Sequence, residues 1–216
     1  MRTIDPVALA FALGLFALLP LLLVTMTSFL KIAIVLSLVR NALGVQQAPP
    51  NMAIYALAIL LSAYVMAPIG HRIVEMVADE KDPTMSVKVL LQVARKSAEP
   101  IREFLMTNSK PNQRMFFHST AKKLWPPELT NDSKESDLLI VTPAFVVSEL
   151  TSAFEIGFLL YLPFVVIDLV VSNILMAMGM MMVSPVTISL PLKLFLFVMV
   201  DGWSRLIHGL IDTYIR

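Results

Sequence analysis

The 216-residue chain contains no cysteine. This absence excludes disulfide bonds, cysteine-ligated metals, iron–sulfur clusters and thiol chemistry. The chain also lacks the phosphate-binding loops GxxxxGK(S/T) and GxGxxG, and it lacks the nucleophile elbow GxSxG. We therefore predict that the protein is not an enzyme, has no catalytic residues and binds no cofactor.

Charged residues are also scarce. They make up 15% of the chain, against about 25% in soluble domains, and 57% of the residues are apolar. Of the 33 charged residues, 21 lie between Gly70 and Asp137. So little charge elsewhere cannot cover a soluble fold, which predicts an integral membrane protein. The net charge of +1 forms no dense basic patch, so we do not expect nucleic-acid binding.

The histidines give no indication of a metal site. His71 and His208 each have a carboxylate one helical turn later, Glu75 and Asp212, and His118 stands apart from both. A zinc site needs three or four ligands, and neither pair has a third candidate nearby. We therefore predict helix-surface pairs at His71 and His208 and no metal centre.

The N-terminal region reads as two hydrophobic helices. Val7–Leu30 carries no charge and would extend roughly 36 Å as a helix, enough to cross a hydrocarbon core of about 30 Å. We expect it to be retained as a span instead of cleaved as a signal peptide, with a kink at Pro20. The QQAPPN segment predicts a turn, after which a second helix should begin near Asn51 and end near Pro68.

The polar middle region shows helical spacing of apolar residues. Thr84–Asn108 follows this spacing, and Pro100 is expected to open a second helix after a break. Asn112–Trp125 predicts a further short helix, ended by Pro126. Because its apolar residues are patterned, we interpret the region as a small helical subdomain and not as a linker.

Five charged residues interrupt the C-terminal hydrophobic region: Glu149, Glu155, Asp168, Lys193 and Asp201. A charge at the bilayer centre costs at least about 2.5–3.5 kcal/mol, so we expect a broken hairpin that packs against other subunits. Glu149 and Glu155 lie about 240° apart around a helix and do not share a face. We interpret these charges as structural and expect Asp168 and Lys193 to pair across the hairpin.

The predicted fold is therefore all-α, an integral membrane-type protein of two broken helical hairpins with a small polar helical subdomain between them. The first hairpin occupies 1–69, the polar subdomain 70–137, and the second hairpin 138–216. Lys31 and Arg40 flank the first turn, and the positive-inside rule places that turn in the cytoplasm. Four spans then place both termini and the polar subdomain on the outer face of the membrane.

A methionine run dominates the second hairpin. Met176, Met178, Met180, Met181 and Met182 surround Gly179 within seven residues. On an ideal helix these side chains would point all around the axis instead of along one stripe. The run is either apolar filler or an adaptable lining, because unbranched, polarizable methionine re-packs easily around changing partners.

Three segments resemble the SctR/FliP family, whose members are core subunits of the type III secretion export apparatus. They are TSFLKIAIVLSLVRNALGVQQAPPNM (Thr27–Met52), PAFVVSELTSAFEIGF (Pro143–Phe158) and PFVVIDLVVSNILMAMGMMMVSPVTISLPLKLFLFVMVDGW (Pro163–Trp203). The segments VQQAPPNM and FEIGFLLYLPF resemble those of the injectisome branch, which delivers effectors into host cells and contributes to virulence.

The resemblance implies a pore-forming subunit of the bacterial inner membrane, in a complex that protrudes into the periplasm. It implies a homo-pentamer that joins SctS- and SctT-type subunits, together with SctU- and SctV-type components and the needle or inner rod. Unfolded secreted polypeptides would pass through this assembly. The five methionines and Gly179 would then form a gasket loop across the channel.

Three alternatives stay open at the level of sequence. The first is a flagellar export subunit of the same family. The second is an ion or solute transporter that uses Glu149, Glu155, Asp168 and Lys193 as a path, although we find no convincing internal repeat. The third is a structural scaffold in which the methionine run is only packing.

Overall fold

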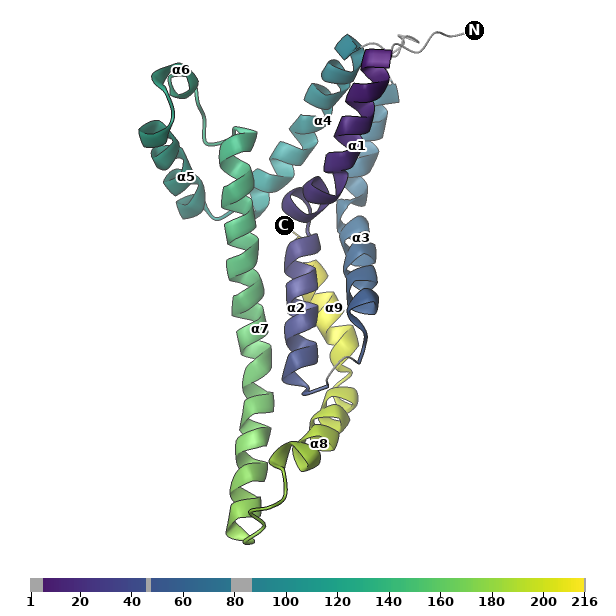
Figure 1. The fold of residues 1–216 in the computed structure, drawn as a ribbon, viewed down its shortest axis with the longest axis vertical. Coiled ribbons are helices and arrows are strands. Elements are labelled where there is room, and N and C mark those ends of the chain that lie inside the picture. The colour runs from purple at the N-terminus through teal and green to yellow at the C-terminus, as the bar shows by residue number, and fades with distance from the viewer. Residues whose placement is uncertain (1–5, 46–47, 79–86, 216) are drawn as a thin grey trace. The chain divides into compact units, whose positions relative to one another are not determined.

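The computed structural model describes residues 6–45, 48–78 and 87–215 (Figure 1). Over these ranges all regular structure is helical and there is no strand, which confirms the predicted all-α class. The helices are α1 (Pro6–Met26), α2 (Phe29–Ala42), α3 (Asn51–Ala78), α4 (Val87–Asn108), α5 (Pro111–Leu124), α6 (Pro127–Thr130), α7 (Leu138–Ala177), α8 (Pro185–Met199) and α9 (Gly202–Asp212).

Length and composition identify candidate membrane spans among the described residues. Asn51–Met76 within α3 and Leu138–Ala177 are each long and apolar enough to cross a membrane. The pairs α1–α2 and α8–α9 pass the same test if each pair counts as one broken span. The chain therefore carries two candidate spans, or up to four, which agrees with the predicted membrane protein. The arrangement as two hairpins stays a prediction.

The chain divides into two compact units, and the division differs from the order of segments along the sequence. The first unit comprises Met1–Leu30 and Ala63–Glu149, and the second comprises Lys31–Ser62 and Leu150–Arg216. Each unit therefore combines distant parts of the chain. The predicted segments 1–69, 70–137 and 138–216 describe where polar and apolar sequence alternate, and as domains they stay a prediction.

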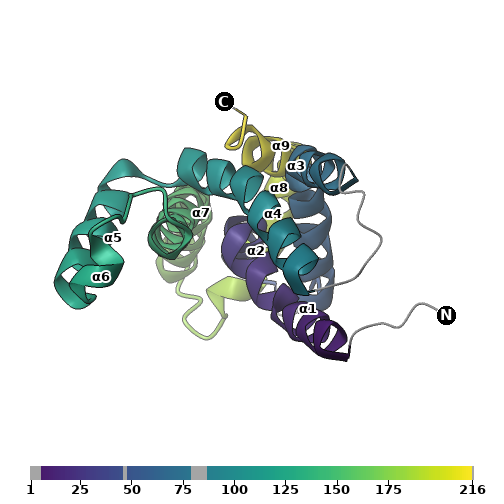
Figure 2. The same cartoon turned by 90° about the horizontal axis from the view of Figure 1, so that it is seen from above.

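The first unit has its core where α4 meets the start of α7. Leu105, Val141 and Phe145 are fully buried there, and the Phe104 and Phe145 rings pack with centroids 5.6 Å apart. Met26, at the end of α1, packs against the same cluster. Helices α1 and α4 lie side by side, as do α5 and α6 (Figure 1 and Figure 2).

The first predicted helix is too long at its C-terminal end. Helix α1 ends at Met26, and α2 begins at Phe29. The Thr27 hydroxyl donates a hydrogen bond to the Leu23 carbonyl and accepts one from the Phe29 amide. A threonine side chain that bonds to nearby backbone ends one helix and caps the next. The helix that we predicted over Val7–Leu30 is therefore interrupted at Thr27, and the separate helix Phe29–Ala42 was not predicted.

Two interior prolines do not act as predicted. Helix α3 continues past Pro68 to Ala78, and α4 passes through Pro100 without a break. An interior proline removes one hydrogen bond, whereas ending an apolar helix leaves four carbonyl groups without intrahelical partners. In α4, Leu105 packs into the core, so tertiary packing stabilises the helix around its proline.

The predicted helix at Asn112–Trp125 is confirmed as α5, displaced by one residue at each end. Its first residue is Pro111, a residue type favoured at the start of a helix. Arg114 Nη1 donates to the Met106 carbonyl and the Ser109 hydroxyl, each at 3.0 Å, and so links α5 to the end of α4. The short helix α6 was not predicted.

The second unit brings α2 against the middle of α7. A Cβ atom added to Gly157 would lie 2.2 Å from Leu38 Cδ1 and 3.2 Å from Leu38 Cβ. No larger residue fits at 157 while Leu38 keeps its place, so this glycine allows the two helices to approach closely. Elsewhere along α2, Ile32, Val35 and Leu36 are also fully buried.

Of the three C-terminal helices, α7 has no break at its prolines, and the bend lies between α8 and α9. Helix α7 is continuous through Pro143 and Pro163, whereas α8 and α9 meet at a bend of 62°. Asp201, at the bend, has a φ of 53°, a left-handed conformation that aspartate tolerates better than most residues. A Cβ atom on Gly202 would lie 2.4 Å from the Phe197 ring, so only glycine fits beside that ring.

Candidate functional site

The methionine run is a loop and not a helix beyond Ala177. The Met180 amide donates to the Leu175 carbonyl at 2.9 Å, and the Gly179 amide donates to the Met176 carbonyl at 3.0 Å. Gly179 has a φ of 72°. This pair of hydrogen bonds around a left-handed glycine is the Schellman motif, which ends a helix and satisfies its last carbonyls. Gly179 therefore determines where α7 stops.

Backbone hydrogen bonds continue through the loop. The Met181 amide donates to the Gly179 carbonyl at 3.0 Å, and the Val183 amide donates to the Met180 carbonyl at 3.2 Å. Ser184 is extended and precedes Pro185 at the first position of α8, where a proline costs no hydrogen bond. The loop backbone is thus ordered. Met176 lies in the last turn of α7 and the other four methionines follow it; we call the whole segment 176–182 the methionine loop.

All five methionine side chains are exposed in the single chain. Exposure runs from 41% at Met180 to 85% at Met181 and 101% at Met182, with Met176 and Met178 between these limits. A cluster of exposed, large apolar side chains indicates a surface that interacts with another protein or with membrane. Their assignment as a gasket stays a prediction, as does that of Gly179 within it.

A buried ion pair joins α8 to α7 within the second unit. Lys193 Nζ lies 2.6 Å from Asp168 Oδ2 and donates a second hydrogen bond, of 3.3 Å, to the Ala42 carbonyl. The Lys193 side chain is 7% exposed and that of Asp168 is 41% exposed. The structure brings the two residues together as predicted.

The second hydrogen bond of Lys193 was not predicted. Ala42 is the last residue of α2, and carbonyl groups at a helix C-terminus carry partial negative charge and lack intrahelical partners. The ammonium group therefore neutralises a carboxylate and caps a helix at the same time. One side chain connects α2, α7 and α8, which explains how a lysine is buried among apolar residues.

Two further basic residues stabilise α2 at its ends. Arg40 Nη1 donates to the Pro49 carbonyl at 3.3 Å and to Asn51 Oδ1, across the turn between α2 and α3. At the other end, Lys31 Nζ lies 3.7 Å from the centroid of the Tyr214 ring. From the sequence we used Lys31 and Arg40 only to predict the orientation of the chain in the membrane. The signal that could have indicated these contacts was a lone cation within an apolar stretch.

The three remaining predicted charges differ in their exposure. Glu149 is 2% exposed and belongs to the first unit, while Glu155 is exposed on the part of α7 in the second unit. Asp201 is exposed at the bend between α8 and α9. The roles of these three residues stay a prediction.

The described part of the chain contains no group of three or more residues that could bind a metal ion. His71 Nδ1 lies 3.3 Å from Glu75 Oε1, and both side chains are largely exposed. This confirms the predicted surface pair at His71. The pair at His208 and Asp212 stays a prediction.

Comparison with known proteins identifies the family. The sequence profile of the FliP family matches residues 12–210, a range that includes the methionine loop and the Asp168–Lys193 pair. The chain belongs to the FliP family. This confirms the resemblance that the three sequence segments indicate.

Several well-covered relatives support this membership. The FliP-family chain is 52% identical over 210 residues to the Yop proteins translocation protein R of Yersinia pestis, with 97% of each chain covered. It is 47% identical over 206 residues to the harpin secretion protein HrpW of Pseudomonas syringae pv. syringae, covering 95% of this chain and 99% of the relative. It is 44% identical over 213 residues to the virulence protein YscR of Salmonella typhimurium, with 97% of each covered.

Proposed function

We propose that this FliP-family chain is a core subunit of a type III secretion export apparatus of the injectisome branch. Relatives that align over nearly their whole length carry names that refer to translocation, harpin secretion and virulence. These names favour the injectisome over the flagellar alternative. In this role the chain assembles with itself, and with SctS- and SctT-type subunits, into a channel for unfolded polypeptides.

The observation that carries the proposal is the exposed methionine loop at the end of α7. Its backbone is ordered by the Schellman motif around Gly179, and its five methionine side chains are exposed. Copies of such a loop around a channel axis would close it with apolar, flexible side chains. The same side chains would re-pack around a passing polypeptide without selecting its sequence.

The length of α7 supports an assembly that extends beyond the bilayer. The helix has 40 residues and is therefore about 60 Å long, twice the thickness of a hydrocarbon core of about 30 Å. An apolar helix of this length must tilt strongly or be covered by protein over much of its surface. We propose that other subunits in the inner membrane and on its periplasmic side cover it, including SctU- and SctV-type components and the needle or inner rod.

The sharpest test of substrate passage is a single-cysteine crosslink, which is straightforward because the native chain contains no cysteine. Met178→Cys in the assembled complex should form an adduct with a cysteine in a secreted substrate that is stalled in the channel. Met199→Cys is a matched control, since Met199 is 68% exposed and Met178 is 67% exposed, but Met199 lies outside the loop.

The expected result is an adduct at Met178→Cys and none at Met199→Cys. Equal adducts at both positions would mean that the loop has no special relation to the substrate path. No adduct at either position, in complexes that still secrete, would favour the scaffold alternative and contradict the proposal.

A further inference from the structure

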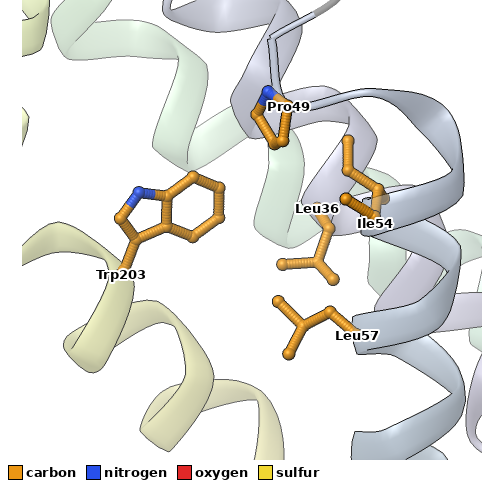
Figure 3. A pocket seen from close by; sticks show the side chains of 6 residues that line it. Leu36, Pro49, Ile54, Leu57 and Trp203 are labelled. Carbon is orange, nitrogen blue, oxygen red and sulfur yellow. The ribbon is translucent and has the colours of Figure 1, made fainter.

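The second unit contains an apolar cavity of about 360 Å³. Its walls come from α2, from α9, and from the start of α3 with the turn before it. The lining residues are Leu36, Pro49, Ala53, Ile54, Leu57 and Trp203. Figure 3 shows the Trp203 indole facing the leucine and isoleucine side chains across the open space.

The chemistry of the lining restricts what can bind. None of the lining side chains carries a charge, and the only polar side-chain atom among them is the Trp203 indole nitrogen. A polar ligand would lose its water without gaining partners, so the occupant must be apolar. The volume is within the range of about 300–1,000 Å³ that is typical of small-molecule sites.

The surroundings of the cavity supply such an occupant. Its α3 wall lies in Asn51–Met76, which is long and apolar enough to span a membrane. The apolar molecules at high concentration around such a helix are lipid acyl chains. From Asn51 to Leu57 the helix rises roughly 9 Å, so a chain lying along this wall would run from the turn toward the bilayer interior.

A cation lies at the turn end of the cavity. Pro49 lines the cavity, and its carbonyl accepts a hydrogen bond from Arg40 Nη1 at 3.3 Å. A guanidinium group is well suited to bind phosphate, and a phospholipid carries its phosphate close to its acyl chains. Trp203, on the opposite wall, is a residue type enriched at membrane interfaces.

We propose that this cavity binds one acyl chain of a membrane phospholipid, with the headgroup phosphate at Arg40. The apolar lining and the adjacent cation match the two parts of that molecule. The bound chain would fill the space between α2, α3 and α9, where an empty cavity would forfeit dispersion contacts. This role goes beyond polypeptide passage, because it concerns a lipid ligand held within the second unit.

Tryptophan quenching tests the proposal directly. The chain has two tryptophans, so Trp125→Phe leaves Trp203 as the only indole fluorophore. The full-length variant is reconstituted into phosphatidylglycerol–phosphatidylethanolamine vesicles with plain or brominated acyl chains, because bromine quenches an indole that it contacts. We expect strong quenching of Trp203 in brominated vesicles. Emission that is equal in the two kinds of vesicle would overturn the proposal.

A pocket-filling variant separates a bound chain from bulk lipid. Ala53→Phe places a ring in the cavity and should abolish most of the quenching. Ala56→Phe is the matched control, since Ala56 is exposed on the same helix and does not line the cavity; it should leave the quenching unchanged. Equal quenching in both variants would assign it to bulk lipid and contradict the proposal.

The phosphate contact and the assembled complex provide two further tests. Arg40→Gln should weaken the quenching, and Arg40→Lys, which keeps the charge, should retain most of it. In the complete complex, a phospholipid with a photoactivatable acyl chain should label the peptides that line the cavity, and Ala53→Phe should reduce this labelling. Labelling that is absent from the complex would assign the cavity to a neighbouring subunit and overturn the proposal.

Discussion

Lys193 Nζ lies 2.6 Å from Asp168 Oδ2 and 3.3 Å from the Ala42 carbonyl. The two members of the ion pair are not equally buried: the lysine side chain is 7% exposed and the aspartate side chain is 41% exposed. Removing the aspartate therefore has a different consequence from removing the lysine. A buried cation without its partner is costly, whereas a partly exposed carboxylate keeps access to other partners.

We predict that Asp168→Ala destabilises the protein more than Lys193→Met does. Breaking a buried ion pair costs about 3–5 kcal/mol when a charge is left buried, and the exposure of Asp168 places the expected value at the lower end. The combination Asp168→Leu with Lys193→Met should be close to wild type, because neither charge remains. Thermal unfolding of the purified chain measures all three. A larger loss from Lys193→Met would contradict this account.

The contact with Ala42 also affects the charge-swapped variant. Exchanging the two residues restores an ion pair but places a carboxylate beside the carbonyl at the C-terminus of α2, where negative charge is unfavourable. We expect the swapped protein to assemble better than either single reversal but less well than wild type. The yield of assembled complex tests this. Equal failure of all three variants would argue against the pair.

Gly179→Ala should weaken the end of α7. A left-handed conformation costs about 1–2 kcal/mol for a residue with a Cβ atom, and nothing near Gly179 would clash with that atom, so the cost is conformational. Gly179→Asn should cost less, because asparagine tolerates this conformation. Gly70→Ala is the control: it lies inside α3 with open space around it and should stabilise the chain by about 0.5–1 kcal/mol. Equal effects at both glycines in unfolding experiments would contradict the prediction.

Gly157→Ala should disturb the packing of α2 on α7. The added methyl group would overlap Leu38, and overpacking of this kind costs about 1–3 kcal/mol. Leu38→Ala creates room, so the double variant should lose less stability than the sum of the two single losses. A double-mutant cycle on unfolding free energies measures this coupling. Additive losses would show that the two residues do not constrain each other.

Replacing the five loop methionines by leucine should affect polypeptide passage but not the sealing of the idle channel. Leucine keeps apolar volume, so the idle channel should stay closed. Leucine is branched and less adaptable than methionine, so a substrate without folded domains should be secreted more slowly. Secretion assays and resting conductance on the same cells provide the two readouts. Wild-type secretion in the leucine variant would show that adaptability is not required.

Some features of this fold follow from local chemistry and could be predicted from the sequence. The turn after α2, the start of α5 at a proline and the end of α7 at a glycine are examples. The pairing of Asp168 with Lys193 was also predictable, since a lone cation and a lone anion in apolar helices stabilise each other.

Other features depend on contacts between distant residues. Continuation of α3 through Pro68 and of α4 through Pro100 depends on packing and on the cost of open helix ends, which no local pattern shows. The capping of α2 by Lys193 joins residues that are 151 positions apart. The division into two compact units, each built from separate parts of the chain, likewise has no signal in hydrophobic spacing.

The most direct test of the central claim is the resting ion conductance of the assembled complex. Met176, Met178, Met180, Met181 and Met182 are all replaced by alanine, and the control carries Met52→Ala and Met199→Ala, two exposed methionines outside the loop. We predict a clear rise in ion leakage and a lower membrane potential for the loop variant, and no change for the control. Unchanged conductance and membrane potential in an assembled loop variant would contradict the proposal that these methionines seal a channel.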